Sequence, residues 1–510
     1  MNFENKIQQI ESLRNELIPG GSESAQNIQH KAGKLTARER VDQLLDPGSF
    51  SEVELFVKPI DTGLPIDKKT QRGDGLITGY GTVKGKPICV WAQDATVLGG
   101  RFGIIHGAKM VRLLERAIKA QIPCVGLIDS NGLKAEDLIT TPSNYNYDAM
   151  MQMQIKASGL IPQISLVMGP CVGAAAVSAL LADYVFMVKN TSYLCVGMET
   201  AGDEGFKLGN AADHDRKSGC CDFLAQDDQD CLAKTRALLE LLPLNYNAKS
   251  EPIKSDDSAD REVPELVDIV PVDSRKPYNL RKLIKIIIDK NDFFEIKKNW
   301  ATNLIVGFGR MDGRTVGIIG NNSMVKGGCM DVDAADKHCR MVRFCDAFNI
   351  PIIYLADTPA FLPSIKQEHK GIIRHGAKTV FANSVTTVPQ VQLYIRKCYS
   401  GGNLAMPGNN LGGDFGIAWP ITELMLMQPE GAVSIIYRKE IAKAENPKEE
   451  FKKRLVQFKS AGAVENLWEA MTIQDFIHPK NTRIKLIDTL KYLQDKSIES
   501  HWNRHDNMPL

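Results

Sequence analysis

The stretch ITGYGTVKGKPICVWAQDATVLGGRFGIIHGAKMVRLLERAIKAQIPCVGLIDS, residues 77 to 130, returns later in the chain as a second copy that begins near Ile305. Every matched pair is separated by 228 positions, as Gly79 is from Gly307 and Asp129 is from Asp357. The other matched pairs are Gly81 and Gly309, Gly85 and Gly313, Gly99-Gly100 and Gly327-Gly328, Lys109 and Lys337, Arg112 and Arg340, and Pro123 and Pro351. A repeat of this length is a whole domain, so the sequence predicts two similar domains. Ligand pockets favour domain interfaces, and we expect the functional site where the two domains meet.

The pattern within and after the first copy alternates between strands and helices. TVKGKPICVWA predicts two short strands that turn at Lys84-Gly85, residues 102 to 119 predict a helix, and IPCVGLIDS predicts a buried strand. Beyond it, residues 149 to 160 predict a helix, ISLVMGP a strand and AAAVSALLA another helix. Alternating strands and helices indicate βα units around a parallel or mixed sheet, so we expect an α/β fold.

Composition sets broad limits on the class of protein. The chain has 510 residues, is 43% hydrophobic and carries a formal net charge of +1, which gives no global attraction to nucleic acid. The N-terminus lacks a basic region followed by an apolar run, and no stretch of about twenty apolar residues could form a transmembrane helix. The 11 cysteines show no CxxC or Cys/His spacing, so we expect reduced thiols, no metal site and a cytoplasmic location.

Recognisable segments precede and join the two predicted domains. Residues 5 to 18 have apolar side chains at helical spacing, GGSES after them reads as a turn, and TARE at Thr36 is a capping box for a second helix. The stretch between Leu244 and Arg275 is polar and contains proline, which is typical of a linker. We therefore expect an N-terminal domain over residues 1 to 250 and a C-terminal domain over residues 251 to 510.

Two other features invite a catalytic assignment that the residues support weakly. GYGTVKGKP has its glycines at the wrong spacing for a dinucleotide-binding loop, and Pro87 stands where a phosphate-binding loop has serine or threonine, so we interpret it as a β-turn. No other stretch of the sequence has the pattern of an ATP site. Asp129 and Asp357 form a carboxylate pair by repeat position, but each ends a strand, where capping the following loop is a commoner role than catalysis.

Two stretches of small residues carry more information about chemistry. GPCVGAAAVSAL, residues 169 to 180, and RKCYSGGNLAM, residues 396 to 406, each follow an apolar strand and lie where a helix is expected to begin. At such a turn the backbone can approach a ligand closely, and the free N–H groups of the first helical turn suit the negative oxygen of an enolate. Close packing of small residues between a helix and a sheet explains the same pattern, and the residues alone leave both explanations open.

Taken in order, the motifs resemble those of the carboxyltransferase family of biotin-dependent acyl-CoA carboxylases and decarboxylases. The matching stretches, spread over about residues 30 to 420, are KLTARERVDQLLDPGSF, GDGLITGYGTVKGKPICVWAQDATVLGG, GLIDS, MGPCVGAAAVSALLADY, VGFGRMDGRTVGIIGN, CRMVRFCDAFNIP, GIIRHGAK and IAWP. The resemblance implies two crotonase-like domains, of which the N-terminal one binds acyl-CoA and the C-terminal one receives biotin from a biotin carboxyl carrier protein. It also implies a homohexamer. A biotin carboxylase subunit or a membrane decarboxylase subunit is implied as a partner, because the chain has no biotinylation sequence like AMKM and no ATP site.

The resemblance also implies roles for particular residues. Gly173 and Ala174 would hold the thioester oxygen as its enolate forms, Gly401 and Gly402 would hold the carbonyl oxygen of biotin, and biotin itself would shuttle the α-proton. Further acyl-CoA contacts are expected at Gly99, Gly100, Arg101, Lys109, Gly132 and Leu404, and biotin contacts at Phe361, Gly327 and Gly328. Arg101 and Lys109 follow a glycine pair near a helix start, where anions such as the CoA phosphates are favoured, but a solvated helix face explains them equally well.

Departures from the family pattern leave the substrate and the level of activity open. Ala174, Ala360 and Ser364 stand where glycines are usual. SGGNLAM looks closer to methylcrotonyl-type than to propionyl-type members, although Leu404 replaces the tyrosine of the methylcrotonyl-type motif. The sequence does not set the direction of transfer, carboxylation or decarboxylation. Two other classes compete: a crotonase-type hydratase or isomerase, for which Glu136 would supply the acidic side chain, and a non-catalytic scaffold subunit, which the altered glycines would fit.

Overall fold

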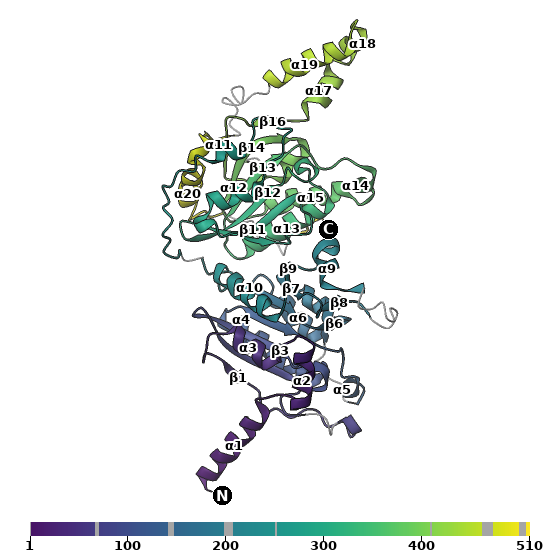
Figure 1. Cartoon of the computed structure of the whole chain (residues 1–510), viewed down its shortest axis with the longest axis vertical. Coiled ribbons are helices and arrows are strands. Elements are labelled where there is room, and N and C mark those ends of the chain that lie inside the picture. Colours follow the sequence, from purple (N-terminus) through teal and green to yellow (C-terminus); the bar gives the residue numbers. More distant parts are fainter. Residues whose placement is uncertain are drawn as a thin grey trace. The chain divides into compact units, whose positions relative to one another are not determined.

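A computed structural model of the chain describes residues 2–66, 71–140, 147–197, 208–249, 252–408, 411–461, 473–498 and 506–509. The chain divides into two compact units, Met1–Ala248 and Lys249–Leu510 (Figure 1). The boundary expected at residue 250 falls next to this division. Each unit contains its own sheet and its own set of helices.

The first unit is built on a seven-stranded sheet. Its strand order is β1 (Ser51–Val53), β2 (Leu76–Val83), β3 (Lys86–Gln93), β4 (Cys124–Ile128), β5 (Gln163–Val167), β7 (Tyr184–Val188) and β9 (Phe223–Ala225). Neighbouring strands are antiparallel from β1 to β3 and parallel from β3 onward. A separate parallel pair joins β6 (Pro170–Val172) to β8 (Tyr193–Cys195). The mixed sheet confirms the expected α/β class.

The helices of the first unit follow the sequence pattern in most places. They are α1 (Phe3–Leu17), α2 (Glu23–Lys31), α3 (Ala37–Leu44), the short η2 (Leu98–Gly100), α4 (Ile104–Ala120), α5 (Ala135–Thr140), α6 (Tyr147–Ala157), α7 (Ala174–Leu180), α9 (Ala211–Asp213), η4 (His214–Ser218) and α10 (Asp228–Leu241). The capping box is confirmed, because Thr36 and Glu39 each bond to the other's backbone N–H. The turn expected at GGSES is wrong in part, since Ser22 caps α2 there. Helix α1 has no buried residue, and Ile10 on it is 55% exposed.

The second unit repeats this plan on a larger sheet. Its strand order is β10 (Phe294–Ile296), β11 (Leu304–Met311), β12 (Arg314–Asn321), β13 (Ile352–Thr358), β14 (Gln390–Tyr399), β15 (Phe415–Ala418) and β17 (Asp475–Phe476), and β16 (Glu423–Met425) pairs with β14. Its helices are α11 (Leu266–Ile269), α12 (Leu280–Ile287), η5 (Asp289–Asn291), η6 (Lys326–Gly328), α13 (Val332–Ala347), α14 (Ile365–His369), α15 (Ile372–Ser384), α16 (Ser400–Ala405), α17 (Pro429–Ile436), α18 (Arg438–Lys443), α19 (Pro447–Ala461), η9 (Pro479–Asn481) and α20 (Thr482–Tyr492). Strands from β12 to β15 are parallel.

The internal repeat is visible in the element bounds themselves. Strands β2 and β3, the turn η2 and helix α4 each begin 228 positions before β11, β12, η6 and α13, as Leu76 does before Leu304. The correspondence continues past the second strand, because the isolated bridge between Phe102 and Leu133 has its equivalent between Met330 and Phe361. The two units therefore share their fold as well as their sequence, and the prediction of two repeat-related α/β domains is confirmed.

Each unit has its own apolar core. In the second unit α12 and α20 pack on one face of the sheet, where Leu283 and Leu486 join a cluster with Ile318 of β12. All of the cysteines lie in the described residues, and each is a free thiol. Among the described residues, no helix is long and apolar enough to cross a membrane, and no cluster of acidic, histidine or cysteine side chains could hold a metal ion.

Candidate active site

The two small-residue turns singled out in the sequence are themselves related by the repeat. Gly173 and Ala174 lie 228 positions before Gly401 and Gly402, and each pair lies where a strand passes into a helix. Gly173 follows β6 and precedes α7, and Gly401 follows β14 inside the first turn of α16. The same local structure is thus built once in each unit.

Backbone geometry explains why the first turn requires glycine. Gly173 has φ 65° and ψ −129°, a conformation that is accessible to glycine and strained for other residues. A Cβ added there would meet nothing closer than the carbonyl oxygen of Val196 at 3.7 Å, so the backbone and not crowding imposes the glycine. Ala174 has a negative φ, so the alanine that replaces a second glycine is tolerated at this position.

The hydrogen bonds of this turn change the expected donor set. The N–H of Gly173 donates to the carbonyl oxygen of Cys195 at 2.9 Å and is therefore already occupied. Ala174 is half-buried, and no acceptor for its N–H is found in the part of the chain that the structure describes. The role of Gly173 and Ala174 in holding the thioester oxygen stays a prediction, with the two residues contributing differently. Gly173 supplies the backbone turn, and Ala174 supplies the free donor.

The second turn combines strain with close packing. Ser400, the first residue of α16, has φ 49°, which is uncommon for a residue with a side chain. A Cβ at Gly401 would lie 2.7 Å from Cδ2 of Phe361, and a Cβ at Gly402 would lie 2.8 Å from Cγ2 of Thr358. Close packing therefore accounts for both glycines. Within the described residues their N–H groups also have no acceptor, so close packing and free donors coexist here.

The residues expected on the biotin side surround the end of β13. The ring of Phe361 packs against Gly401 and against Gly376 of the GIIRHGAK motif. A Cβ at Gly328 would lie 2.4 Å from the carbonyl oxygen of Asp357, while Gly327, with φ 62°, has open space beside it. The structure thus places Phe361, Gly328 and Gly401 around one strand end, which the sequence could indicate only by motif order.

The first unit has the equivalent arrangement at the end of β4. A Cβ at Gly100 would lie 2.3 Å from the carbonyl oxygen of Asp129, and Gly99 accepts a hydrogen bond from the N–H of Asn131 at 2.9 Å. The carbonyl oxygen of Gly132 accepts from the N–H of Phe102, also at 2.9 Å. Gly99, Gly100 and Gly132 therefore lie along one strand end.

Comparison with known proteins agrees with this geometry. A carboxyl transferase domain is matched over residues 28–508. The chain belongs to the carboxyl transferase family. It is 38% identical to the propionyl-CoA carboxylase beta chain of Roseobacter denitrificans and 37% identical to the methylmalonyl-CoA decarboxylase subunit alpha of Propionigenium modestum, with 99% of both chains covered in each case.

A solved structure extends the agreement to three dimensions. The transcarboxylase 12S hexamer, crystallised with methylmalonyl-coenzyme A and methylmalonic acid, matches this chain with a TM-score of 0.96 at 36% identity, over 100% of this chain and 99% of that one. The expected crotonase-like fold and the expected activity class, a biotin-dependent acyl-CoA carboxyltransferase, are confirmed.

Lys109, which was expected to contact acyl-CoA, is buried in this carboxyl transferase chain. Lys109 is only 2% exposed, and its Nζ donates to the carbonyl oxygens of Gly73, at 3.0 Å, and Leu76. Its repeat mate Lys337 is buried in the same way and donates to the carbonyl oxygen of Leu304 at 2.8 Å. Burial lowers the pKa of Lys109 to about 8 and that of Lys337 to about 7. Both lysines fasten the segment that enters the hairpin, so the CoA-phosphate assignment of Lys109 is wrong.

The other charged candidates of the first unit pair with each other. Nη1 of Arg101 lies 3.5 Å from Oε2 of Glu136, and both side chains are about a quarter exposed. The carboxylate of Glu136, the acidic side chain that a hydratase would use, is therefore engaged in an ion pair with Arg101. Arg101 stays within reach of solvent, and Leu404 on α16 is 45% exposed, so both remain available to a ligand.

Asp129 and Asp357 both have a structural role but, among the described residues, each carboxylate forms buried ion pairs instead of capping the following loop as expected. Asp129 is buried between Nη1 of Arg40 and Nζ of Lys34, each at 2.8 Å, and Arg40 also reaches Asp228 at 2.7 Å. Asp357 is paired with the fully buried Arg396 at 2.8 Å. Sequence reasoning missed both arginines. Arg396 had a visible signal, because it is a charged residue inside the apolar strand QLYIRKCY.

A polar network beneath α16 was also missed. Nδ2 of Asn383 donates to the carbonyl oxygen of Ala405 at 2.9 Å, at the end of α16, the helix that contains Gly401 in its first turn. Asn383 is oriented by the hydroxyl of Tyr354, which also donates to Gln390 at 2.9 Å. These partners lie far apart in sequence, so no local pattern indicates them. Ser364, another altered glycine, caps α14 through its hydroxyl, which suits a serine.

Proposed function

We propose that this chain is the carboxyltransferase subunit that moves a carboxyl group between carboxybiotin on a separate carrier protein and an acyl-CoA of the propionyl and methylmalonyl type. The observation that carries the proposal is the pair of repeat-related turns with free backbone N–H groups at Ala174 and at Gly401 and Gly402. Two enolate-like oxygens develop in such a transfer, and two fixed sets of donors match that requirement.

The proposed roles follow the corrected geometry. The N–H of Ala174 holds the thioester oxygen, while Gly99, Gly100, Arg101 and Gly132 line the acyl-CoA side at the end of β4. On the other side, the N–H groups of Gly401 and Gly402 hold the ureido oxygen. Phe361, Gly327 and Gly328 lie around the neighbouring strand end and supply the wall for the biotin ring. Bound carboxybiotin supplies the carboxyl group, and the chain's own contribution is to bind, orient and polarise.

The substrate assignment rests on the relatives and is challenged by one motif. The name of one relative, the carboxylase beta chain, gives propionyl-CoA, while the decarboxylase subunit is named for methylmalonyl-CoA and the transcarboxylase was crystallised with it; the two acyl groups differ by one carboxyl group. The motif SGGNLAM, however, looks closer to that of methylcrotonyl-type members, so a methylcrotonyl-type group is the second candidate. The direction of transfer is part of the proposal to be tested.

The assembly and location belong to the same proposal. We assign a homohexamer, which the transcarboxylase relative forms, and the exposed apolar side chains of Ile435, Ile436 and Val456 on α17 and α19 support burial of this surface between copies. A biotin carboxyl carrier protein is the expected partner, together with a biotin carboxylase or a membrane decarboxylase subunit. The free thiols are typical of a reducing compartment, which supports a cytoplasmic location.

A substrate panel tests the function. Methylmalonyl-, methylglutaconyl- and glutaconyl-CoA would each be supplied to the purified protein with free biotin, and the loss of carbon dioxide would be followed. We expect biotin-dependent decarboxylation of methylmalonyl-CoA, whereas preference for methylglutaconyl-CoA would establish the second candidate. Turnover of enoyl-CoA without biotin would indicate a hydratase, and complete inactivity of a folded hexamer would indicate a scaffold subunit.

A further inference from the structure

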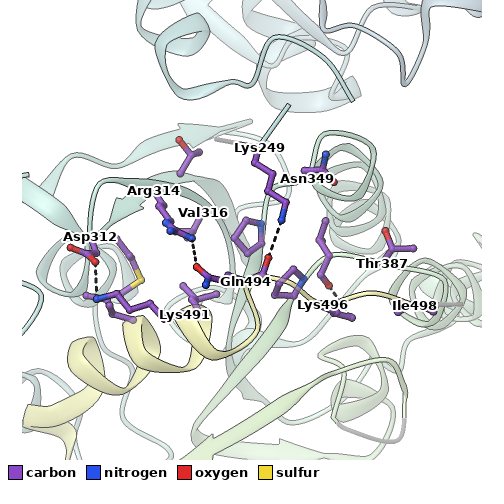
Figure 2. A pocket seen from close by; sticks show the side chains of 17 residues that line it. Lys249, Asp312, Arg314, Val316, Asn349, Thr387, Lys491, Gln494, Lys496 and Ile498 are labelled. Carbon is purple, nitrogen blue, oxygen red and sulfur yellow. Dashed lines mark hydrogen bonds and ion pairs between the residues drawn. The ribbon is translucent and has the colours of Figure 1, made fainter. Parts of the chain in front are cut away.

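A cavity of about 190 Å³ opens in the second unit, away from the turn at Ser400–Gly402. It lies at the amino ends of the parallel strands β12, β13 and β14, whereas that turn follows the carboxyl end of β14. Apolar side chains from β11, β12, the strand approaches and α20 line it, namely Met311, Val316, Pro351, Val388, Pro389, Ile487 and Leu490 (Figure 2). Four cationic side chains stand around it, namely Lys249, Arg314, Lys491 and Lys496.

In the first unit, the region that corresponds to this cavity is covered by the chain itself. Arg314 corresponds to Lys86 of the first unit, whose Nζ donates to the carbonyl oxygens of Glu240 and Leu242 at the end of α10, each at 2.9 Å. The cavity residues Asn349 and Thr387 correspond, by the repeat and by strand register, to Gln121 and Leu160, which are likewise bonded to the chain after α10. There, Asn245 donates to the carbonyl oxygen of Gln121 and Tyr246 to that of Leu160. The first unit therefore fills the corner that the second unit leaves open.

The four cationic side chains differ in whether they have a carboxylate partner. Three of them have carboxylate partners: Lys491 with Asp312 at 2.9 Å, Lys496 with Asp414 at 2.8 Å, and Lys249 with Asp495 at 3.2 Å. Among the described residues, Arg314 has only an amide partner, Oε1 of Gln494 at 3.1 Å. Figure 2 shows Arg314 and Lys249 both extending toward Gln494. A guanidinium fork beside an apolar cavity is matched by a carboxylate or a phosphate, which it can bind through two hydrogen bonds.

We propose that this cavity is a binding site for a small amphipathic anion, with its apolar body on Val316, Ile487 and Leu490 and its carboxylate or phosphate on Arg314. The size of the ligand follows from the cavity, which is smaller than the roughly 300–1,000 Å³ of sites for drug-sized molecules. A short-chain carboxylate such as hexanoate has the required chemistry. The site is distinct from the carboxyl-transfer turns and does not depend on the function proposed for them.

Calorimetric titration of the full-length protein tests the site with three probes: hexanoate, hexyl phosphate and hexanol. We expect saturable binding of at least one of the anions, and binding of hexanol about tenfold weaker or more, because a hydrogen bond to a charged group is lost. Tighter binding of hexyl phosphate than of hexanoate would support the site and assign a phosphate as its head group. Equal affinity for hexanol and both anions would overturn the role of charge.

Two variants locate the binding. Arg314→Gln removes the guanidinium from an exposed position and is expected to weaken anion binding about tenfold while leaving hexanol unchanged. Arg438→Gln is the matched control, because Arg438 is an exposed arginine of α18 outside the cavity, and it should leave both affinities unchanged. The proposal is overturned if folded wild-type protein binds neither anion, or if Arg314→Gln binds them as tightly as the wild type does.

Discussion

Replacing Gly173 by alanine isolates the contribution of one backbone turn. The added Cβ meets no atom closer than 3.7 Å, so the cost comes from φ 65° and ψ −129° alone and amounts to about 1–3 kcal/mol. The chain can relieve this strain by rotating the peptide that joins Gly173 to Ala174. That peptide carries the N–H of Ala174, so the relief turns the proposed donor away from the thioester oxygen.

The expected loss of activity is larger than the loss of stability. Removing one oxyanion donor lowers kcat by about 100-fold to 1,000-fold in enzymes where it has been isolated. A cost of about 1–3 kcal/mol lowers Tm by only about 2–12 °C in a unit of this size. The assay is biotin-dependent decarboxylation of methylmalonyl-CoA at a temperature well below the Tm of the variant, with Tm measured by scanning calorimetry.

Gly159→Ala is the matched control for this prediction. Gly159 also has a positive φ, 73°, and a Cβ there meets nothing within 4 Å. The substitution should therefore cost about 1–2 kcal/mol of stability without touching either turn. The reasoning is refuted if folded Gly173→Ala retains wild-type kcat, or if Gly159→Ala loses as much activity.

Three further predictions concern buried groups. Lys109→Met should lower the free energy of unfolding by about 1–3 kcal/mol, because carbonyl oxygens lose their donor, while the KM for acyl-CoA stays unchanged; a raised KM with unchanged stability would restore the phosphate role. Arg396→Met should cost about 3–5 kcal/mol in urea unfolding, because Asp357 stays buried without its guanidinium, and a neutral result would contradict this. Burial lowers the pKa of His338 to about 3, so between about pH 6.5 and pH 3 the unfolded chain binds a proton that the folded chain does not. The free energy of unfolding should therefore decrease as the pH is lowered through this range, by up to about 1.4 kcal/mol per pH unit. His338→Gln should show a shallower decrease than the wild type, and equal slopes would disprove this prediction.

The fold was largely predictable because the repeat fixes it twice. Two copies at a constant spacing locate the hairpin, the glycine turn, the helix and the following strand in both units, and the structure begins each element at that spacing. The missed helix α2 shows the limit of local pattern. GGSES has turn composition, and the same Ser22 that suits a turn also suits a helix cap.

The site was predictable as motifs but not as hydrogen bonds. The sequence located both turns, yet it could not show that the N–H of Gly173 is consumed by Cys195, which lies on another strand. Lys109 was assigned to the CoA phosphates from its position near the start of a helix. That position does not show which groups the long side chain contacts. Its repeat mate Lys337 held the corrective signal, since a lysine present in both copies is better explained by a structural role that both units share.

The buried cluster of Arg40, Asp129 and Asp228 determines when the first unit can finish folding during synthesis. Its members come from the beginning, the middle and the end of the first unit, and Arg40 bonds to both aspartates. The first unit therefore reaches its final form only once Asp228 has left the ribosome, which happens while most of the second unit is still to be translated. Domains generally fold as units during synthesis, N-terminal first. We expect the emerging chain to complete its first half by closing this ionic cluster, so that the second copy of the same sequence pattern is made beside a partner that is already folded.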